Sequence, residues 1–103
     1  QERFIIVILD NKHRFLSETT VKVGLLNRSL VHPREVFAEA IEQRAAAIIC
    51  IHNHPSGDSS PSEEDKRITR RLQESGELLG IPLLDHVIIS KEDFTSFADE
   101  GWL

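Results

Sequence analysis

The residues with the clearest chemical potential lie in segment 51–65, which reads IHNHPSGDSSPSEED. His52 and His54 end an apolar run, and in an extended chain this spacing turns both imidazoles to one side, about 6.6 Å apart along the backbone. Asp65 falls in the first turn of an expected helix, and the intervening loop can return it to the same place. Two histidines and one carboxylate can hold Zn²⁺ and leave a fourth position for water, which is typical of catalytic zinc sites. We therefore predict one Zn²⁺ per chain.

Other interpretations of these residues remain open at this stage. A single histidine at the end of a strand is more often packed or solvated than a metal ligand, but the pair with a returning carboxylate favours the metal. Ser62, three residues before Asp65, fits a capping box, which would explain both residues without excluding a ligand role for Asp65. Cys50 lies on the same strand face but about 13 Å from His54 along an extended chain, so we interpret it as a buried thiol.

The elements that must position these residues follow from hydrophobic periodicity. Their order, β-β-α-β-α-β, predicts a single α/β domain with a mixed sheet and flanking helices. His32-Pro33 is expected to open the first helix, and Gly80 to end the second. The expected strands are 3–9, 15–26, 45–51 and 83–89, with a short edge strand at 94–97. The first expected helix starts at Pro33 and has four apolar residues on one face: Val36, Phe37, Ala40 and Ile41. The second starts at Ser62 and has three residues on its buried stripe: Ile68, Leu72 and Leu79.

Composition limits the classes of protein that this chain can represent. Its 103 residues suit one domain with a packed core, and no apolar run is long enough to span a membrane. A single cysteine cannot form an internal disulfide, so we expect a reducing compartment such as the cytoplasm. It also cannot supply the Pro-Cys-x-x-Cys element of zinc nucleoside deaminases, which excludes that class of enzyme. The chain has no methionine and opens directly into an apolar run, which suggests a piece of a longer protein.

Charge argues against strong binding to duplex DNA. The net charge is −5, and residues 74–103 carry seven acidic side chains and one basic one, Lys91. A duplex DNA binder usually shows a basic face. Four basic residues on the second expected helix hint at an anionic partner, although a solvated helix face is the simpler interpretation: Lys66, Arg67, Arg70 and Arg71.

The segment 52–65 resembles the JAMM signature of the JAB/MPN metalloprotease family: His-x-His, seven residues, Ser, two residues and Asp. The wider sequence is most similar to the RadC branch of that family, over nearly the whole chain. The motifs that carry this resemblance are HNHPSG at 52–57, PSEED at 61–65, HPREVF at 32–37 and LDHVI at 84–88. The resemblance implies a JAB/MPN-like metal-binding domain over residues 1–103, forming the C-terminal part of a protein that carries a helix-hairpin-helix segment before it.

The resemblance also implies roles for two residues outside the metal group. Glu35 matches the glutamate that acts as general base beside the metal, while Ser62 would donate a hydrogen bond to the oxyanion. From the sequence alone, Glu39 and Glu42 are rivals of Glu35, and all three could be solvated residues of the first helix. His86 could support the metal ligands or could be satisfied by neighbouring backbone, and we favour the latter.

Two functions are consistent with this pattern. The first is a zinc hydrolase that cleaves a peptide, isopeptide or other amide bond of a peptide or protein substrate. The second is a non-catalytic, metal-stabilised binding module of a DNA-processing protein, since RadC proteins are named for DNA repair. Glu35 and Ser62 favour the hydrolase, because a purely structural metal site needs neither.

Overall fold

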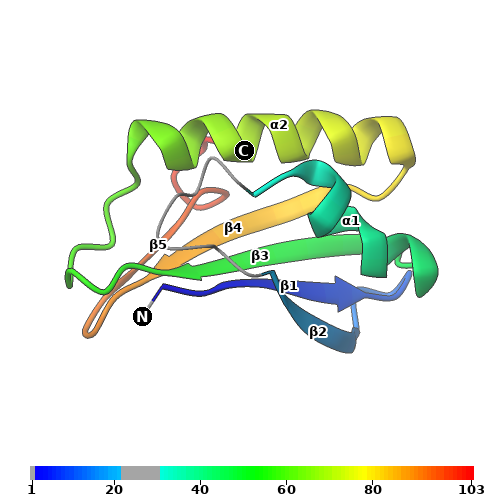
Figure 1. The fold of residues 1–103 in the computed structure, drawn as a ribbon, viewed down its shortest axis with the longest axis horizontal. Helices are drawn as coiled ribbons and strands as arrows, with labels where there is room; N and C mark the ends of the chain where they lie inside the picture. Colours follow the sequence, from blue (N-terminus) through cyan, green and yellow to red (C-terminus); the bar gives the residue numbers. More distant parts are fainter. Residues whose placement is uncertain (1, 22–30) are drawn as a thin grey trace.

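The computed structural model describes residues 2–21 and 31–103. It contains one mixed sheet with strand order β2-β1-β3-β4-β5, in which only β3 and β4 are parallel among the described strands. Figure 1 shows α2 and α1 on one side of this sheet. The predicted α/β fold with a mixed sheet is confirmed. The elements are β1 (Phe4–Leu9), β2 (Phe15–Val21), α1 (Pro33–Glu42), β3 (Ala47–Asn53), α2 (Glu63–Leu79), β4 (Leu83–Ile89) and β5 (Phe94–Ser96).

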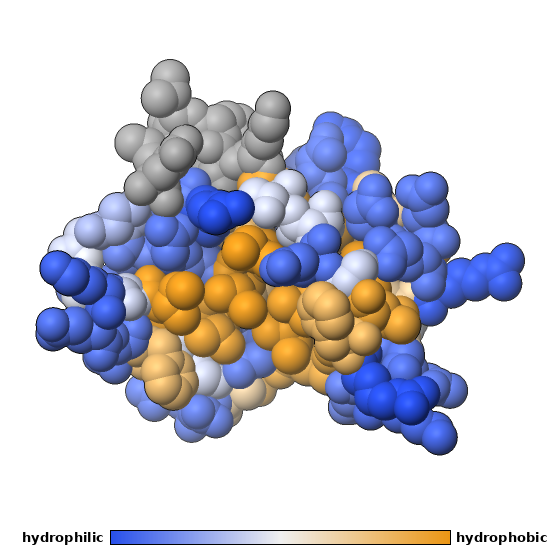
Figure 2. All heavy atoms as spheres, turned by 90° about the horizontal axis from the view of Figure 1, so that it is seen from below, coloured by the Kyte–Doolittle hydropathy of each residue, from blue (hydrophilic) through white to orange (hydrophobic). Residues whose placement is uncertain are grey.

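Successive side chains of the central strands point alternately to the two faces of the sheet. Even-numbered residues of β1 and β3, such as Ile6 and Cys50, are fully buried and form the core beneath the helices. The odd-numbered residues face the other way, and most of them are only half-buried. Figure 2 shows a band of hydrophobic side chains across this opposite face. His52, a strand residue of the expected metal group, lies on this buried, helix-covered face.

Most predicted elements are present, and the differences concern their ends. The third strand runs over Ala47–Asn53 rather than 45–51, because its pairing with β1 and β4 continues through His52. The second strand is seen over Phe15–Val21, and the rest of its predicted range lies outside the described residues. The short edge strand is present as Phe94–Ser96.

Two predicted core positions are wrong. In α2 the buried stripe runs from Ile68 through Leu72 to Gly76, and Leu79 is 46% exposed. Gly76 occupies the inward position of the last turns, so the stripe has already ended before Leu79. In α1 the buried residues end at Ala40, and Ile41 is exposed.

Helix α2 is defined at both ends as its sequence predicts. Ser62 is the N-cap, and Gly80 ends the helix with a φ of 74°, a left-handed conformation that glycine adopts without steric cost. The helix crosses over between the parallel strands β3 and β4. This crossover returns the chain so that the first turn of α2 faces the end of β3. Neither helix in the described part of the chain has the length and apolar character needed to cross a bilayer.

Candidate metal centre

The structure brings together the three residues that the sequence predicts as metal ligands. Each of His52, His54 and Asp65 offers one ligand atom, and these atoms lie within 4.8 Å of one another. His52 and His54 come from the end of β3, and Asp65 comes from the first turn of α2. All three side chains are buried. The loop between the strand and the helix thus carries the carboxylate back to the histidine pair, as the spacing indicated.

The separations within this group fit a single ion. Asp65 Oδ2 lies 3.1 Å from His54 Nε2, and Asp65 Oδ1 lies 3.5 Å from His52 Nδ1. Two ligands at about 2.0–2.1 Å from a tetrahedral Zn²⁺ stand about 3.3 Å apart. The two imidazole rings are nearly perpendicular, with centroids 4.8 Å apart. Both separations between Asp65 and the histidines are therefore close to that expected for two ligands of one cation.

Hydrogen bonding around His54 gives an independent reason to expect a cation. Its Nδ1 lies 2.8 Å from the carbonyl oxygen of Asp58, which can only accept a hydrogen bond, so Nδ1 carries a hydrogen. In the neutral ring, Nε2 then presents a lone pair to the carboxylate of Asp65. Two acceptors at this distance repel each other unless a proton or a metal ion lies between them. A backbone carbonyl that fixes the tautomer of a ligating histidine is a common feature of metal sites.

Ser62 and Asp65 form the capping box that their spacing indicates. Asp65 N–H donates to Ser62 Oγ at 3.0 Å, and Ser62 N–H donates to Asp65 Oδ2 at 2.8 Å. The same carboxylate therefore caps the helix and faces both histidines. Ser62 accepts one hydrogen bond in this arrangement and keeps its own O–H group as a donor. The cap and the expected role toward an oxyanion are thus compatible.

The structure does not bring Glu35 into this group. Glu35 is exposed in the first turn of α1, and Glu39 and Glu42 also lie on that helix outside the group. A different carboxylate takes the place beside the histidines. Glu2 Oε1 lies 3.6 Å from His52 Nε2, and only 4% of the Glu2 side chain is exposed.

The pairing of β1 with β3 explains the position of Glu2. Phe4 is directly opposite His52 in this antiparallel pair, and Glu2 precedes Phe4 by two residues on the same face. The sequence carries a signal for this position, because the inward alternation of Phe4 and Ile6 extends back to Glu2. A carboxylate on the buried face of a central strand is rare without a function or a partner.

His86 lies behind the metal group, but its contacts differ from our interpretation. The Thr69 hydroxyl donates to the carbonyl oxygen of Asp65 at 2.7 Å, so it accepts from His86 Nδ1 at 2.6 Å. A side chain rather than backbone thus satisfies Nδ1, and Nε2 is buried without a hydrogen-bond partner among the described residues. Burial, followed by the charge of His52, lowers the pKa of His86 to about 4. His86 is therefore neutral near pH 7 and links β4 to the first turns of α2.

Cys50 does not join the group. It is fully buried in the core, and burial raises the pKa of its thiol well above the usual range. A neutral, inaccessible thiol is neither a metal ligand nor a nucleophile. Its interpretation as a small core residue is consistent with this position.

Comparison with known proteins agrees with this geometry. A family model described as RadC-like JAB domain matches residues 1–102. The chain belongs to this family. It is 54% identical to a UPF0758 protein of Bacillus licheniformis, 55% identical to one of Methanospirillum hungatei and 53% identical to one of Geotalea uraniireducens, each over all 103 residues. The RadC-like JAB domain seen here spans less than half the length of these relatives, 45–46%.

Proposed function

We propose that this RadC-like JAB domain is a zinc-dependent hydrolase that cleaves a peptide, isopeptide or other amide bond. The observation that supports it best is the buried carboxylate of Glu2, which lies beside His52, a member of the group with His54 and Asp65. Two imidazoles and one carboxylate suit Zn²⁺ and leave a coordination position for water. Hydrolysis needs a general base and a purely structural metal site does not, so a buried carboxylate beside the ligands supports hydrolysis over the binding-module alternative.

The metal would supply two effects when bound: it lowers the pKa of a coordinated water to about 7 and polarises the scissile carbonyl. Glu2 then accepts a proton from the attacking water and passes it to the leaving amine. Ser62 donates its hydroxyl hydrogen to the oxyanion. Asp58, through its carbonyl, holds His54 in the tautomer that presents Nε2 to the group.

The general base proposed here is Glu2 rather than Glu35, and one experiment tests both. Glu2→Gln keeps the shape of the side chain but removes its basicity, so zinc content should remain near one per chain. Hydrolysis should fall by about 10²–10⁴-fold, the usual contribution of general acid–base catalysis. Glu35→Gln is the matched control and should retain both zinc and turnover.

The measurement combines elemental analysis with mass spectrometry of products from a proteome-derived peptide mixture. His52→Ala should lose both zinc and products. Full turnover in Glu2→Gln would remove Glu2 from the mechanism, and a loss confined to Glu35→Gln would restore the role that the family resemblance implies. Zinc-dependent stability with no products from any variant would favour the binding module. We place this activity in a reducing compartment such as the cytoplasm, where the buried thiol of Cys50 stays reduced.

A further inference from the structure

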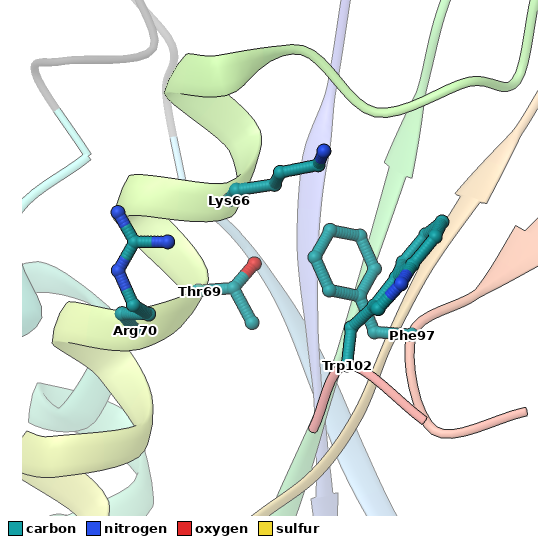
Figure 3. A pocket seen from close by; sticks show the side chains of 5 residues that line it. All are labelled: Lys66, Thr69, Arg70, Phe97 and Trp102. Atoms are coloured by element: carbon teal, nitrogen blue, oxygen red, sulfur yellow. The ribbon is translucent and has the colours of Figure 1, made fainter. Parts of the chain in front are cut away.

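A second hollow lies on the same side of the sheet as the metal group. Its volume is about 240 Å³, and it is lined by residues of α2 and of the C-terminal segment: Lys66, Thr69, Arg70, Phe97 and Trp102. Figure 3 shows the side chains of α2 on one side of this hollow and the two aromatic rings on the other. We refer to it as the tryptophan pocket.

The lining combines two cations with an apolar surface. Lys66 and Arg70 supply positive charge, and none of the lining residues is acidic. Phe97 is buried, while Trp102 is 46% exposed and packs edge-on against Phe97 with ring centroids 5.4 Å apart. A ligand that fits both parts has an apolar group for the rings and an anionic group for Lys66 and Arg70.

Lys66 is available to such a ligand, and Arg70 is exposed. Lys66 Nζ lies 5.6 Å from the centroid of the Trp102 ring and 3.5 Å from a carboxylate oxygen of Glu63, whose side chain is 88% exposed. An exposed pair of this kind contributes little free energy, so Lys66 can turn to a ligand at small cost. Arg67, in contrast, is directed to Glu64 and lies outside the pocket.

The pocket adjoins the proposed metal centre. Lys66 follows Asp65 directly in α2, and the Thr69 hydroxyl donates to the carbonyl oxygen of Asp65. On the other side, Phe97 stacks on His86 with centroids 4.8 Å apart, and His86 stacks in turn on His52 at 5.8 Å. On this path Phe97 and His86 separate a group seated in the pocket from His52, while Thr69 connects the pocket to Asp65.

We propose that the tryptophan pocket binds the C-terminal residue of a peptide substrate, with its free carboxylate at Lys66 and Arg70 and its apolar side chain against Phe97 and Trp102. This inference rests on the proposed hydrolase function and deepens it, because it specifies short peptides or protein tails that end in an apolar residue. One carboxylate suits the pocket better than a nucleic acid, since the acidic segment 74–103 repels an extended polyanion.

Trp102 provides a direct test, because it is the only tryptophan of the chain. Its fluorescence is followed in the metal-free protein during titration with N-acetyl-Gly-Leu and, separately, with N-acetyl-Gly-Leu amide. The free acid should bind about tenfold or more tightly than the amide, the difference expected for one charge-assisted contact. Lys66→Gln and Arg70→Gln should abolish this preference. Arg67→Gln and Arg71→Gln, which change charges of the same helix outside the pocket, should preserve it.

The outcomes separate this inference from the proposed function. Binding of the free acid without hydrolysis in the zinc-loaded protein supports the pocket and counts against the hydrolase. Hydrolysis with equal affinity for acid and amide overturns the pocket and leaves the hydrolase intact. Tighter binding of a short oligothymidylate than of the peptide acid also overturns the proposal, and it would identify the pocket as a nucleic-acid site.

Discussion

Ser62 caps α2, and a single substitution can separate this role from the proposed donation of its hydroxyl to the oxyanion. As an N-cap, its replacement by alanine should cost about 1 kcal/mol of stability, and glycine should restore most of that loss. As an oxyanion donor, its replacement by glycine should still lower turnover by about 10²–10³-fold, because glycine has no side-chain donor. We expect Ser62→Gly to melt near the wild-type temperature and to lose turnover. Near-wild-type turnover in Ser62→Gly would reduce Ser62 to a helix cap.

His86 makes the stability of the metal-free protein depend on pH. Its pKa is about 4 in the folded chain and about 6.5 in the unfolded chain, so the unfolded chain binds an extra proton between these values. Stability should therefore decrease as the pH falls from about 6.5 to 4, by about 3 kcal/mol in total from this residue. Urea unfolding of the metal-free protein and of His86→Phe, repeated across this pH range, measures the effect as a difference in the slope of stability against pH. Since the variant keeps His52 and His54, equal slopes would contradict the prediction.

The group of His52, His54 and Asp65 was predictable from the sequence, whereas alternation alone indicates only that Glu2 faces inward and not that it lies beside His52. His52, His54 and Asp65 lie within fourteen residues of one another, so a strand, a loop and a helix start are enough to bring them together. Glu2 is fifty residues from His52, and its position depends on the pairing register of β1 with β3. The register between distant strands cannot be read from local periodicity. Without that register, Glu35, an exposed residue of α1, was the nearest match to the family pattern.

At the scale of elements, the packing of α2 against the sheet depends on a glycine. A Cβ atom at Gly76 would lie 2.5 Å from the backbone oxygen of Ile81 and 3.3 Å from the ring of Phe37. Alanine normally stabilises a helix interior relative to glycine by about 0.5–1 kcal/mol. Here the backbone must move, so we expect Gly76→Ala to destabilise the protein by about 1–3 kcal/mol.

Denaturant unfolding measures this effect, with Ser75→Ala as the control in the neighbouring position. The Ser75 hydroxyl donates to the carbonyl of Arg71 in its own helix, so its replacement should change stability by less than about 0.5 kcal/mol. A stabilised Gly76→Ala protein would show that helix propensity outweighs the close approach of the connection to β4.

The elements themselves were largely predictable, and the errors share one cause. Apolar runs and turn residues locate strands and helices, and the cap at Ser62 and the stop at Gly80 bound α2 correctly. The end of β3 and the inward face of the last turns of α2 depend on which neighbours each segment meets. Pairing carries β3 on through His52, while the close packing of Gly76 leaves Leu79 outside. These are tertiary effects that act on otherwise correct local patterns.

At the scale of the whole molecule, the negative net charge of the chain disfavours binding to DNA. The chain carries a net charge of −5, with 17 acidic side chains against 12 Lys and Arg. Nonspecific affinity for duplex DNA comes from basic side chains that displace counterions from phosphates. Acidic side chains outnumber the basic ones on this domain, so we expect weak binding with a shallow dependence on salt.

Fluorescence anisotropy with a labelled duplex, at two salt concentrations, measures this expectation. At physiological salt the dissociation constant should be no tighter than the nonspecific range of about 10⁻⁴–10⁻⁶ M. Whatever binding remains should weaken further when Lys66, Arg67, Arg70 and Arg71 are all replaced by glutamine, because these four basic residues lie within six positions of one helix. Submicromolar, sequence-selective binding would contradict the prediction and would favour the binding module over the hydrolase. Weak binding would support a substrate other than duplex DNA for the activity proposed at His52, His54 and Asp65.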